Sequence, residues 1–253
     1  MRRLPPLALA YHGVALVPLR HDPHRLFVSP EAFVRQVARL RTWGYRLVAF
    51  GELARAAAGG DATGQASLTF DDGFVDNLET LAPVAASEAV PFTVFVVSGW
   101  LGRAHPDAPW TRVVTEEELR ELAAAEGAEI GAHTVTHPDL SHAGYAEARR
   151  ELDASKAALE AVVGAPVEVA AYPHGRASAE AIRAARDAGF AAACAANGRG
   201  TWSDPHFLPR QDVENGVSRL GLRLKRDGVY EPLMRIRAAR AGRRLLLAAT
   251  RNR

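Results

Sequence analysis

Two adjacent carboxylates stand out in TFDDG, where Asp71 and Asp72 directly follow the apolar run SLTF. A pair of imidazoles, His133 and His137, follows another apolar run in AEIGAHTVTHPDL. Three residues separate these histidines, a spacing that predicts both on one side of a helical turn. Two histidines and one carboxylate make a three-ligand metal site with open positions for water and substrate. The remaining carboxylate can then accept a proton from that water.

The two aspartates are expected to differ in role. Neighbouring residues of an extended segment point in opposite directions, so Asp71 and Asp72 do not easily share one ligand position. The alternative is that Asp71 caps a helix that begins near Asp76 and that the histidines are polar surface residues. The four residues together favour the metal site.

The elements that must position these residues alternate regularly between strand and helix. Such alternation predicts βαβ units and a parallel sheet, and about seven units favour an α/β fold of the distorted (β/α)7-type barrel. In such a barrel the active site lies at the C-terminal ends of the strands, where both polar groups stand. The expected strands are 7–14, 46–50, 67–70, 92–99, 128–133, 167–173 and 190–196, and the expected helices are 30–45, 76–89, 115–127, 144–164 and 178–189.

Composition is that of a soluble globular protein. The chain has 253 residues, of which 48% are hydrophobic and 24% charged, so a disordered or fibrous chain is excluded. The only cysteine, Cys194, lies in a small-residue run and is expected in the core. No apolar window is long enough for a membrane span. The N-terminal segment predicts a first strand rather than a signal peptide, which favours a cytoplasmic location.

Charge divides the chain into two predicted parts, a catalytic domain at 1–216 and a basic helical extension at 217–253. The net charge of +2 is the difference between +9 in the extension and −7 in the domain. Seven arginines between Arg235 and Arg253, with the apolar cluster Leu245 to Leu247, predict an amphipathic helix on an anionic membrane surface, at the inner leaflet. The alternative is a solvated arginine-rich helix.

Several motifs together resemble the polysaccharide deacetylases, the carbohydrate esterases with the chitooligosaccharide deacetylase homology domain. The resemblance covers roughly residues 8–214. It implies a metal-dependent hydrolase that removes N- or O-linked acetyl groups from a sugar or polysaccharide. The expected partner is an acetylated glycan or glycolipid, and not a nucleic acid. The motifs are YHGV, FVRQVARLRTWGYRLV, TFDDG, PFTVFVV, EIGAHTVTHPDL, ELDASKAALEAVVGAPVEVAAYPHG, RDAGFAAAC and LPRQDV.

The resemblance also implies residue roles. Asp71 would be the general base, and Asp72, His133 and His137 would bind one divalent ion, usually Zn²⁺, with Ni²⁺, Co²⁺ or Fe²⁺ as alternatives. Water activated by the ion would attack the acetyl carbonyl. The third motif of the family resembles AYPHG. Its implied substrate-binding residues are Tyr172, Pro173 and Gly175, with the backbone N–H of His174 as donor to the oxyanion.

Two departures from the family pattern change which residues are expected to orient the base and to act as the general acid. Ala171 stands where many members have an arginine that orients the base, and Arg210 in FLPRQDV is the candidate replacement, unless it forms a structural ion pair with Asp212. The family's C-terminal leucine-x-histidine motif, which supplies the general acid, is missing after residue 206. His12, after the first strand, is the candidate acid, and His174 competes with it.

Two other functions keep the same fold. One is an amidohydrolase of a small cyclic imide or amide, and the other is a catalytically silent carbohydrate-binding relative. The remaining aromatic and histidine residues are less informative. Trp100, Trp110 and Trp202 are expected in loops, where they stack on sugars or simply pack, and His21, His24, His105 and His142 are expected on the surface.

Overall fold

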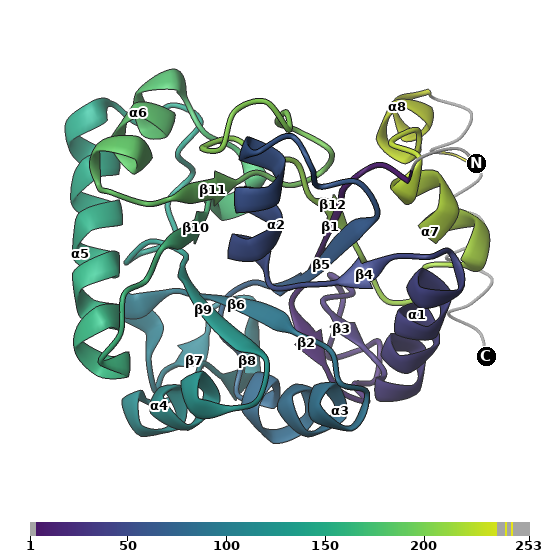
Figure 1. Cartoon of the computed structure of the whole chain (residues 1–253). Helices are drawn as coiled ribbons and strands as arrows, with labels where there is room; N and C mark the ends of the chain where they lie inside the picture. The colour runs from purple at the N-terminus through teal and green to yellow at the C-terminus, as the bar shows by residue number, and fades with distance from the viewer. Residues whose placement is uncertain (1–3, 237–240, 242–243, 245–253) are drawn as a thin grey trace.

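The computed structural model describes residues 4–236, 241 and 244, and its centre is a curled sheet of parallel strands (Figure 1). The strand order is β11-β10-β9-β6-β5-β1-β12, with β4 paired to β5. The predicted fold class and the strands predicted from the apolar runs are confirmed, although several strands are shorter than predicted. The bounds are β1 (Leu7–Tyr11), β4 (Arg46–Leu47), β5 (Gln65–Phe70), β6 (Phe92–Val96), β9 (Ala128–Ala132), β10 (Val169–Ala171), β11 (Ala192–Cys194) and β12 (Gln211–Asp212).

The two edges of this sheet are joined by the segment 208–212. Leu208 pairs in parallel with Cys194 of β11, and Gln211 and Asp212 pair with Leu9 and Ala10 of β1. This segment therefore closes the sheet into a distorted barrel. Arg210 lies at the centre of the closing segment, and its side chain is fully buried.

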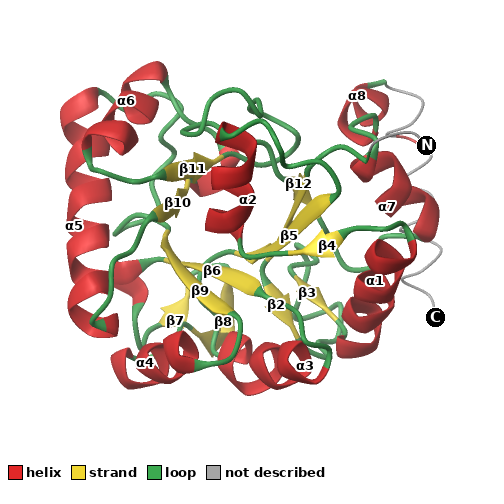
Figure 2. Ribbon diagram, viewed as in Figure 1, coloured by secondary structure: helices red, strands yellow, loops and turns green. Residues whose placement is uncertain are grey.

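Helices cover the outside of the sheet (Figure 2). Apolar residues at helical spacing make them amphipathic, as in α1, where Phe33, Val37 and Leu40 are all buried. Ser29 accepts a hydrogen bond from the N–H of Ala32 and so caps α1. The covering helices are α1 (Pro30–Thr42), α3 (Ala82–Ser87), α4 (Glu116–Ala124), α5 (Tyr145–Val163), α6 (Ala179–Asp187) and α7 (Arg219–Arg226), and α8 (Tyr230–Arg235) packs against α7.

Three further elements are single helical turns. A π-helical turn at Asn77–Leu81 precedes α3, so the predicted helix 76–89 is divided into two parts. Two 3₁₀ turns lie at Ser98–Trp100 and Pro173–Gly175, after β6 and β10. All three lie beyond the carboxyl ends of strands, where the predicted site residues are found.

One helix, α2 (Phe50–Ala58), was not predicted, because the run RLVAF was expected to remain a strand to residue 50. The helix packs against the amino-terminal parts of the strands. The backbone N–H of Phe50 donates to Thr93 Oγ1 at 2.9 Å, and the N–H of Gly51 donates to the Glu129 carboxylate at 3.0 Å. The Phe50 ring meets Phe95 edge-on at 5.7 Å. The helix thus covers the end of the barrel opposite to the predicted site.

Two small sheets lie beyond the main one, and neither was predicted. β2 (Gly13–Val14) pairs in parallel with β3 (Phe27–Val28), and β7 (Ala104–His105) pairs antiparallel with β8 (Ala108–Arg112). These strands are short and lack a clear alternation of polar and apolar residues, which is the signal for a strand. The β7–β8 hairpin becomes important at the site.

The basic extension is described in part. Leu222 of α7 is buried in the main core, and Arg226 stacks over the Trp43 ring at 4.7 Å. The boundary at residue 216 stays a prediction, as does membrane contact. The cluster Leu245 to Leu247 lies outside the described residues. Within the described part of the chain, no helix has the length and apolarity that a bilayer crossing requires.

A buried carboxyl group connects the segment after β5 to β2. Asp76 Oδ2 accepts a hydrogen bond from the Val14 N–H at 2.5 Å, while its buried Oδ1 has no partner among the described residues. Burial raises the pKa of Asp76 to about 7, and the charge of Glu79 adds to this rise. The folded protein therefore holds this proton more tightly than the unfolded chain.

We expect this group to make folding less favourable as the pH rises. Below the ordinary aspartate pKa, Asp76 is protonated in both the folded and the unfolded protein, so it does not change the free energy of unfolding with pH. Between about pH 4 and 7 the free energy of unfolding should fall by up to about 1.4 kcal/mol per pH unit from this group. Asp76→Asn should remove that slope, so the free energy of unfolding of the variant should rise relative to that of the wild type as the pH rises. Urea unfolding at pH 5 and pH 8, with a chelator present, measures the difference.

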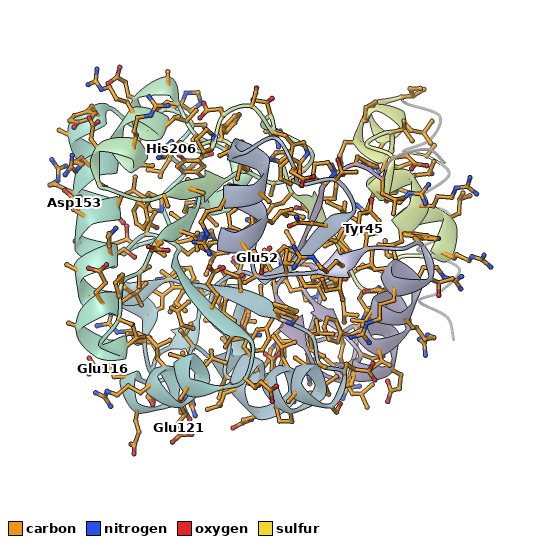
Figure 3. All side chains as sticks on the ribbon, viewed as in Figure 1. Tyr45, Glu52, Glu116, Glu121, Asp153 and His206 are labelled. Carbon is orange, nitrogen blue, oxygen red and sulfur yellow. The ribbon has the colours of Figure 1, made fainter. Side chains whose placement is uncertain are left out.

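The matched control is Glu121→Gln on α4, which removes an exposed carboxylate at the surface (Figure 3). This control should unfold in parallel with the wild type at both pH values. Parallel curves for Asp76→Asn and wild type would contradict the assignment of the slope to Asp76.

Candidate metal centre and active site

The first carboxylate, Asp71, is held by the arginine of the closing segment. Arg210 donates two hydrogen bonds to it, to Oδ1 at 2.6 Å and to Oδ2 at 2.8 Å. Arg210 also donates to Thr69 Oγ1 and to the Ala195 carbonyl, both at 2.9 Å. Of the two partners considered for Arg210, the structure brings it into contact with Asp71. The carboxylate of Asp212 instead accepts from the Asn197 N–H at 3.2 Å.

The ionised form of Asp71 is favoured despite its burial. Burial alone would raise the pKa of Asp71, but the charge of Arg210, the nearby His133 and the two hydrogen bonds from Arg210 together lower it. A bidentate guanidinium also fixes the plane of the carboxylate. Asp71 is therefore an oriented anion at the end of β5.

The second carboxylate, Asp72, leaves the strand direction. Its φ is 74°, in the left-handed region, and Gly73 follows at 79°. The expectation that the two aspartates diverge within an extended segment is therefore wrong in its geometry, because the chain turns at Asp72. The turn lets both side chains line one cavity, while each still has its own partners.

The two histidines approach Asp72 from the loop after β9. His133 Nε2 lies 3.7 Å from Asp72 Oδ1, and His137 Nε2 lies 3.6 Å from the same oxygen. The expected helical turn is not formed. Thr134 and His137 have φ values of 66° and 60°, and these left-handed residues turn the loop so that His137 faces back toward His133. Their ring centroids are 4.9 Å apart.

The Nε2 atoms of both imidazoles face Asp72. The Nδ1–H of His133 donates to the Ala171 carbonyl at 2.8 Å, which leaves its Nε2 as the acceptor. Burial lowers the pKa of His133, and burial together with the neighbouring His133 lowers the pKa of His137 to about 3. These rings are neutral at neutral pH, which is the form that binds a metal.

A divalent ion fits this group of residues. One atom from each of Asp72, His133 and His137 lies within 4.8 Å of the others. Asp72 Oδ1 is buried and has no hydrogen-bond partner among the described residues, although two imidazole nitrogens face it. A buried carboxylate oxygen without a partner is costly, and a cation would satisfy it. One carboxylate with two imidazoles is a donor set that suits zinc.

A cavity of about 250 Å³ lies above this cluster and contains both candidate acids. His12 lies directly after β1, and its backbone carbonyl accepts from Asn77 Nδ2 at 3.0 Å. His174 has a φ of 56° in the turn after β10, and its ring lies 4.7 Å from that of His137. The geometry thus brings both candidates to the cavity and does not choose between them.

The third motif behaves only partly as expected. Tyr172 is fully buried, and its hydroxyl donates to the His206 carbonyl at 2.7 Å, so the expectation that it binds substrate is wrong for this side chain. Pro173 is also buried and does not line the cavity. Gly175 does line it, and a Cβ there would lie 2.3 Å from Ala196 Cβ. Only glycine fits at this position.

Sequence reasoning missed several residues that line the cavity. His105 was expected on the surface, but it is buried and lies 3.2 Å from Asp72 Oδ2. His24 also lines the cavity, and so does Asp212. Trp100, which was expected in a loop, lies in a 3₁₀ turn outside the residues that line the cavity, with its ring 5.2 Å from that of His137. His105 has no partner at ligand spacing in the sequence, so no local signal indicated its position.

Fold and site together define a class of protein. The structure is a distorted α/β barrel with a cluster of one aspartate and two histidines beyond the carboxyl ends of its strands, and a second aspartate is held beside that cluster by an arginine. This is the location at which α/β barrels place their active sites.

The family within this class follows from comparison. Residues 59–193 match the family model of the polysaccharide deacetylases, and the chain belongs to this family. It is 34% identical to a chitooligosaccharide deacetylase of Bradyrhizobium sp. over 168 residues. This alignment covers 63% of this chain and 66% of that protein. A chitooligosaccharide deacetylase of Sinorhizobium fredii is 34% identical over 141 residues, 54% of this chain and 60% of that protein. The chain thus spans less than two thirds of either relative.

A solved structure has the same fold. A Streptococcus pyogenes deacetylase in complex with acetate superposes with a TM-score of 0.74 at 23% identity, over 88% of this chain and 97% of that one. This likeness confirms the predicted barrel.

Proposed function

We propose that this protein is a metal-dependent hydrolase that removes N- or O-linked acetyl groups from a sugar or polysaccharide. The observation that carries the proposal is the convergence of two differently held aspartates on one cavity. Asp71 is fixed by Arg210, and Asp72 faces His133 and His137. Membership in the polysaccharide deacetylase family supports the same reaction.

Asp72, His133 and His137 would hold the ion, with Zn²⁺ as the first candidate and Ni²⁺, Co²⁺ or Fe²⁺ as alternatives. A divalent ion bound there would supply Lewis acidity for the acetyl carbonyl and would lower the pKa of water.

Asp71 is the proposed base, which accepts a proton from the attacking water. Arg210 keeps it ionised and aimed into the cavity. His12 or His174 then donates a proton to the departing sugar nitrogen or oxygen, because both line the cavity. The backbone N–H of His174 is the proposed donor to the oxyanion.

Cavity size bears on the substrate. A volume of about 250 Å³ is smaller than the roughly 300–1,000 Å³ pockets that enclose drug-sized ligands. An acetyl group with part of one sugar ring would occupy it, and the remainder of a glycan would lie outside. We therefore propose an acetylated glycan or glycolipid as the substrate.

Acetate release tests this proposal. The zinc-loaded protein is incubated with a panel of N-acetylated and O-acetylated glycans and, separately, with small cyclic imides. We expect acetate from at least one glycan, and His12→Ala and His174→Ala in the same assay should identify the acid. Imide hydrolysis without acetate release would favour the amidohydrolase, and a zinc-binding protein inert on both would contradict an acetyl hydrolase of these substrates.

A further inference from the structure

His105 is a buried residue that the proposed reaction does not use. It ends β7, in the hairpin with β8, and only 2% of it is exposed. Its Nε2 lies 3.2 Å from Asp72 Oδ2, the oxygen that does not face the two histidines of the cluster. The contact between this ring and Asp72, a candidate metal ligand, suggests that His105 acts through Asp72.

The hydrogen bonds of His105 define its tautomer. The backbone N–H of Asp107 donates to Nδ1 at 3.1 Å, so Nδ1 is the acceptor and the proton lies on Nε2. The Nε2–H then donates to Asp72 Oδ2. Because its lone pair is already occupied, His105 is a neutral donor to the carboxylate rather than a fourth ligand.

The ring of His105 is held on two sides by aromatic residues. Phe74 stacks on it with centroids 4.4 Å apart and an angle of 29° between the rings. Trp100 meets it edge-on at 5.0 Å and 83°. With these contacts and the Asp107 bond, the imidazole has little freedom to turn away from Asp72.

The hairpin that carries His105 is joined directly to the turn that carries Asp72. The N–H of Val114 donates to the Gly73 carbonyl, and the N–H of Val75 donates to the Arg112 carbonyl, both at 3.0 Å. Phe74 and Val113 form an antiparallel bridge between these bonds. Donor and carboxylate therefore belong to one hydrogen-bonded unit, although they are 33 positions apart in the sequence.

We propose that His105 is a positioning residue for the metal centre. By holding Oδ2, it orients the Asp72 carboxylate so that Oδ1 faces His133 and His137. Without this donor, Oδ2 would lose its hydrogen bond, and the carboxylate could rotate away from the cluster. The inference rests on the metal-binding part of the proposed function and is independent of the substrate.

Zinc affinity of the full chain tests this role. Competition with a chromophoric chelator gives the Zn²⁺ dissociation constant for wild type, His105→Phe and His105→Gln. Phenylalanine keeps a ring between Phe74 and Trp100 but removes the donor, so we expect zinc to bind roughly 10–100-fold more weakly, as for the loss of other outer partners of metal ligands. Glutamine supplies an N–H at similar reach and should restore most of the affinity.

The matched control is His24→Phe, which changes another histidine at the cavity that has no contact with Asp72 among the described residues. Its zinc affinity should equal that of the wild type. Wild-type affinity in His105→Phe would overturn the proposal. So would equal losses in the Phe and Gln variants with equally lowered unfolding midpoints, since these would indicate packing alone. Wild type that binds no zinc overturns it as well, whereas zinc binding without acetate release contradicts only the proposed reaction.

Discussion

Asp71→Asn is expected to lower turnover by roughly 10²–10⁴-fold while zinc still binds. Asparagine keeps one oxygen for Arg210 but cannot accept the proton that the proposed base removes from water. Asp71 is outside the three-residue cluster, so its loss leaves every candidate ligand in place. The measurement is the rate of acetate release at saturating zinc, together with the zinc content of the purified variant.

Stability must be measured beside the rate, because this change leaves the buried Arg210 without its anion. Thermal unfolding shows whether the variant is folded at the assay temperature. Asp107→Asn is the matched control, since it removes another carboxylate of the same cavity that makes no contact with Arg210 in the described structure. A folded Asp71→Asn protein with turnover within a few-fold of wild type would require a different base.

His137→Ala is expected to abolish zinc binding and, with it, activity. Outer partners of metal ligands alone contribute about 10–100-fold to affinity, and removal of a ligand should cost more than that. The remaining pair, Asp72 and His133, would leave two of the three donors. Zinc content after dialysis, by elemental analysis, is the measurement.

His174→Ala provides the comparison for this ligand. Its ring lies 4.7 Å from His137, but it is not part of the three-residue cluster, so zinc should be retained. Equal zinc content in His137→Ala and wild type would exclude His137 as a ligand. Loss of zinc in both variants would instead indicate that the cluster needs a different set of residues.

The residues predicted from local motifs were found together because each motif follows a strand. Asp71 and Asp72 come directly after β5, and His133 and His137 follow β9, so a parallel sheet brings both groups to one end of the barrel. Arg210 was identified differently, as the residue in FLPRQDV that could replace the arginine which many family members have at the position of Ala171. The short apolar runs indicate the strands, and their alternation with helices predicts that the strands are parallel.

The contacts that were missed depend on the backbone or on distant pairing. The left-handed φ values of Asp72 and His137 have no local signal, since neither residue is glycine. The burial of Tyr172 depends on its bond to a carbonyl 34 residues later in the chain. The role of His105 depends on the pairing of its hairpin with the turn after Asp72, and no periodic pattern in the hairpin indicates that pairing.

The position of Arg210 in the closing segment has a consequence for the order of events in folding. Arg210, which holds the proposed base, comes 139 positions after Asp71, in the segment 208–212 that joins both edges of the sheet. While a ribosome is still making this region, β5 and its aspartates are already available, but Asp71 has no guanidinium beside it. Contacts of such long sequence separation form late, because the chain must close a large loop to make them. We therefore expect Asp71 to acquire its fixed orientation only when the barrel closes.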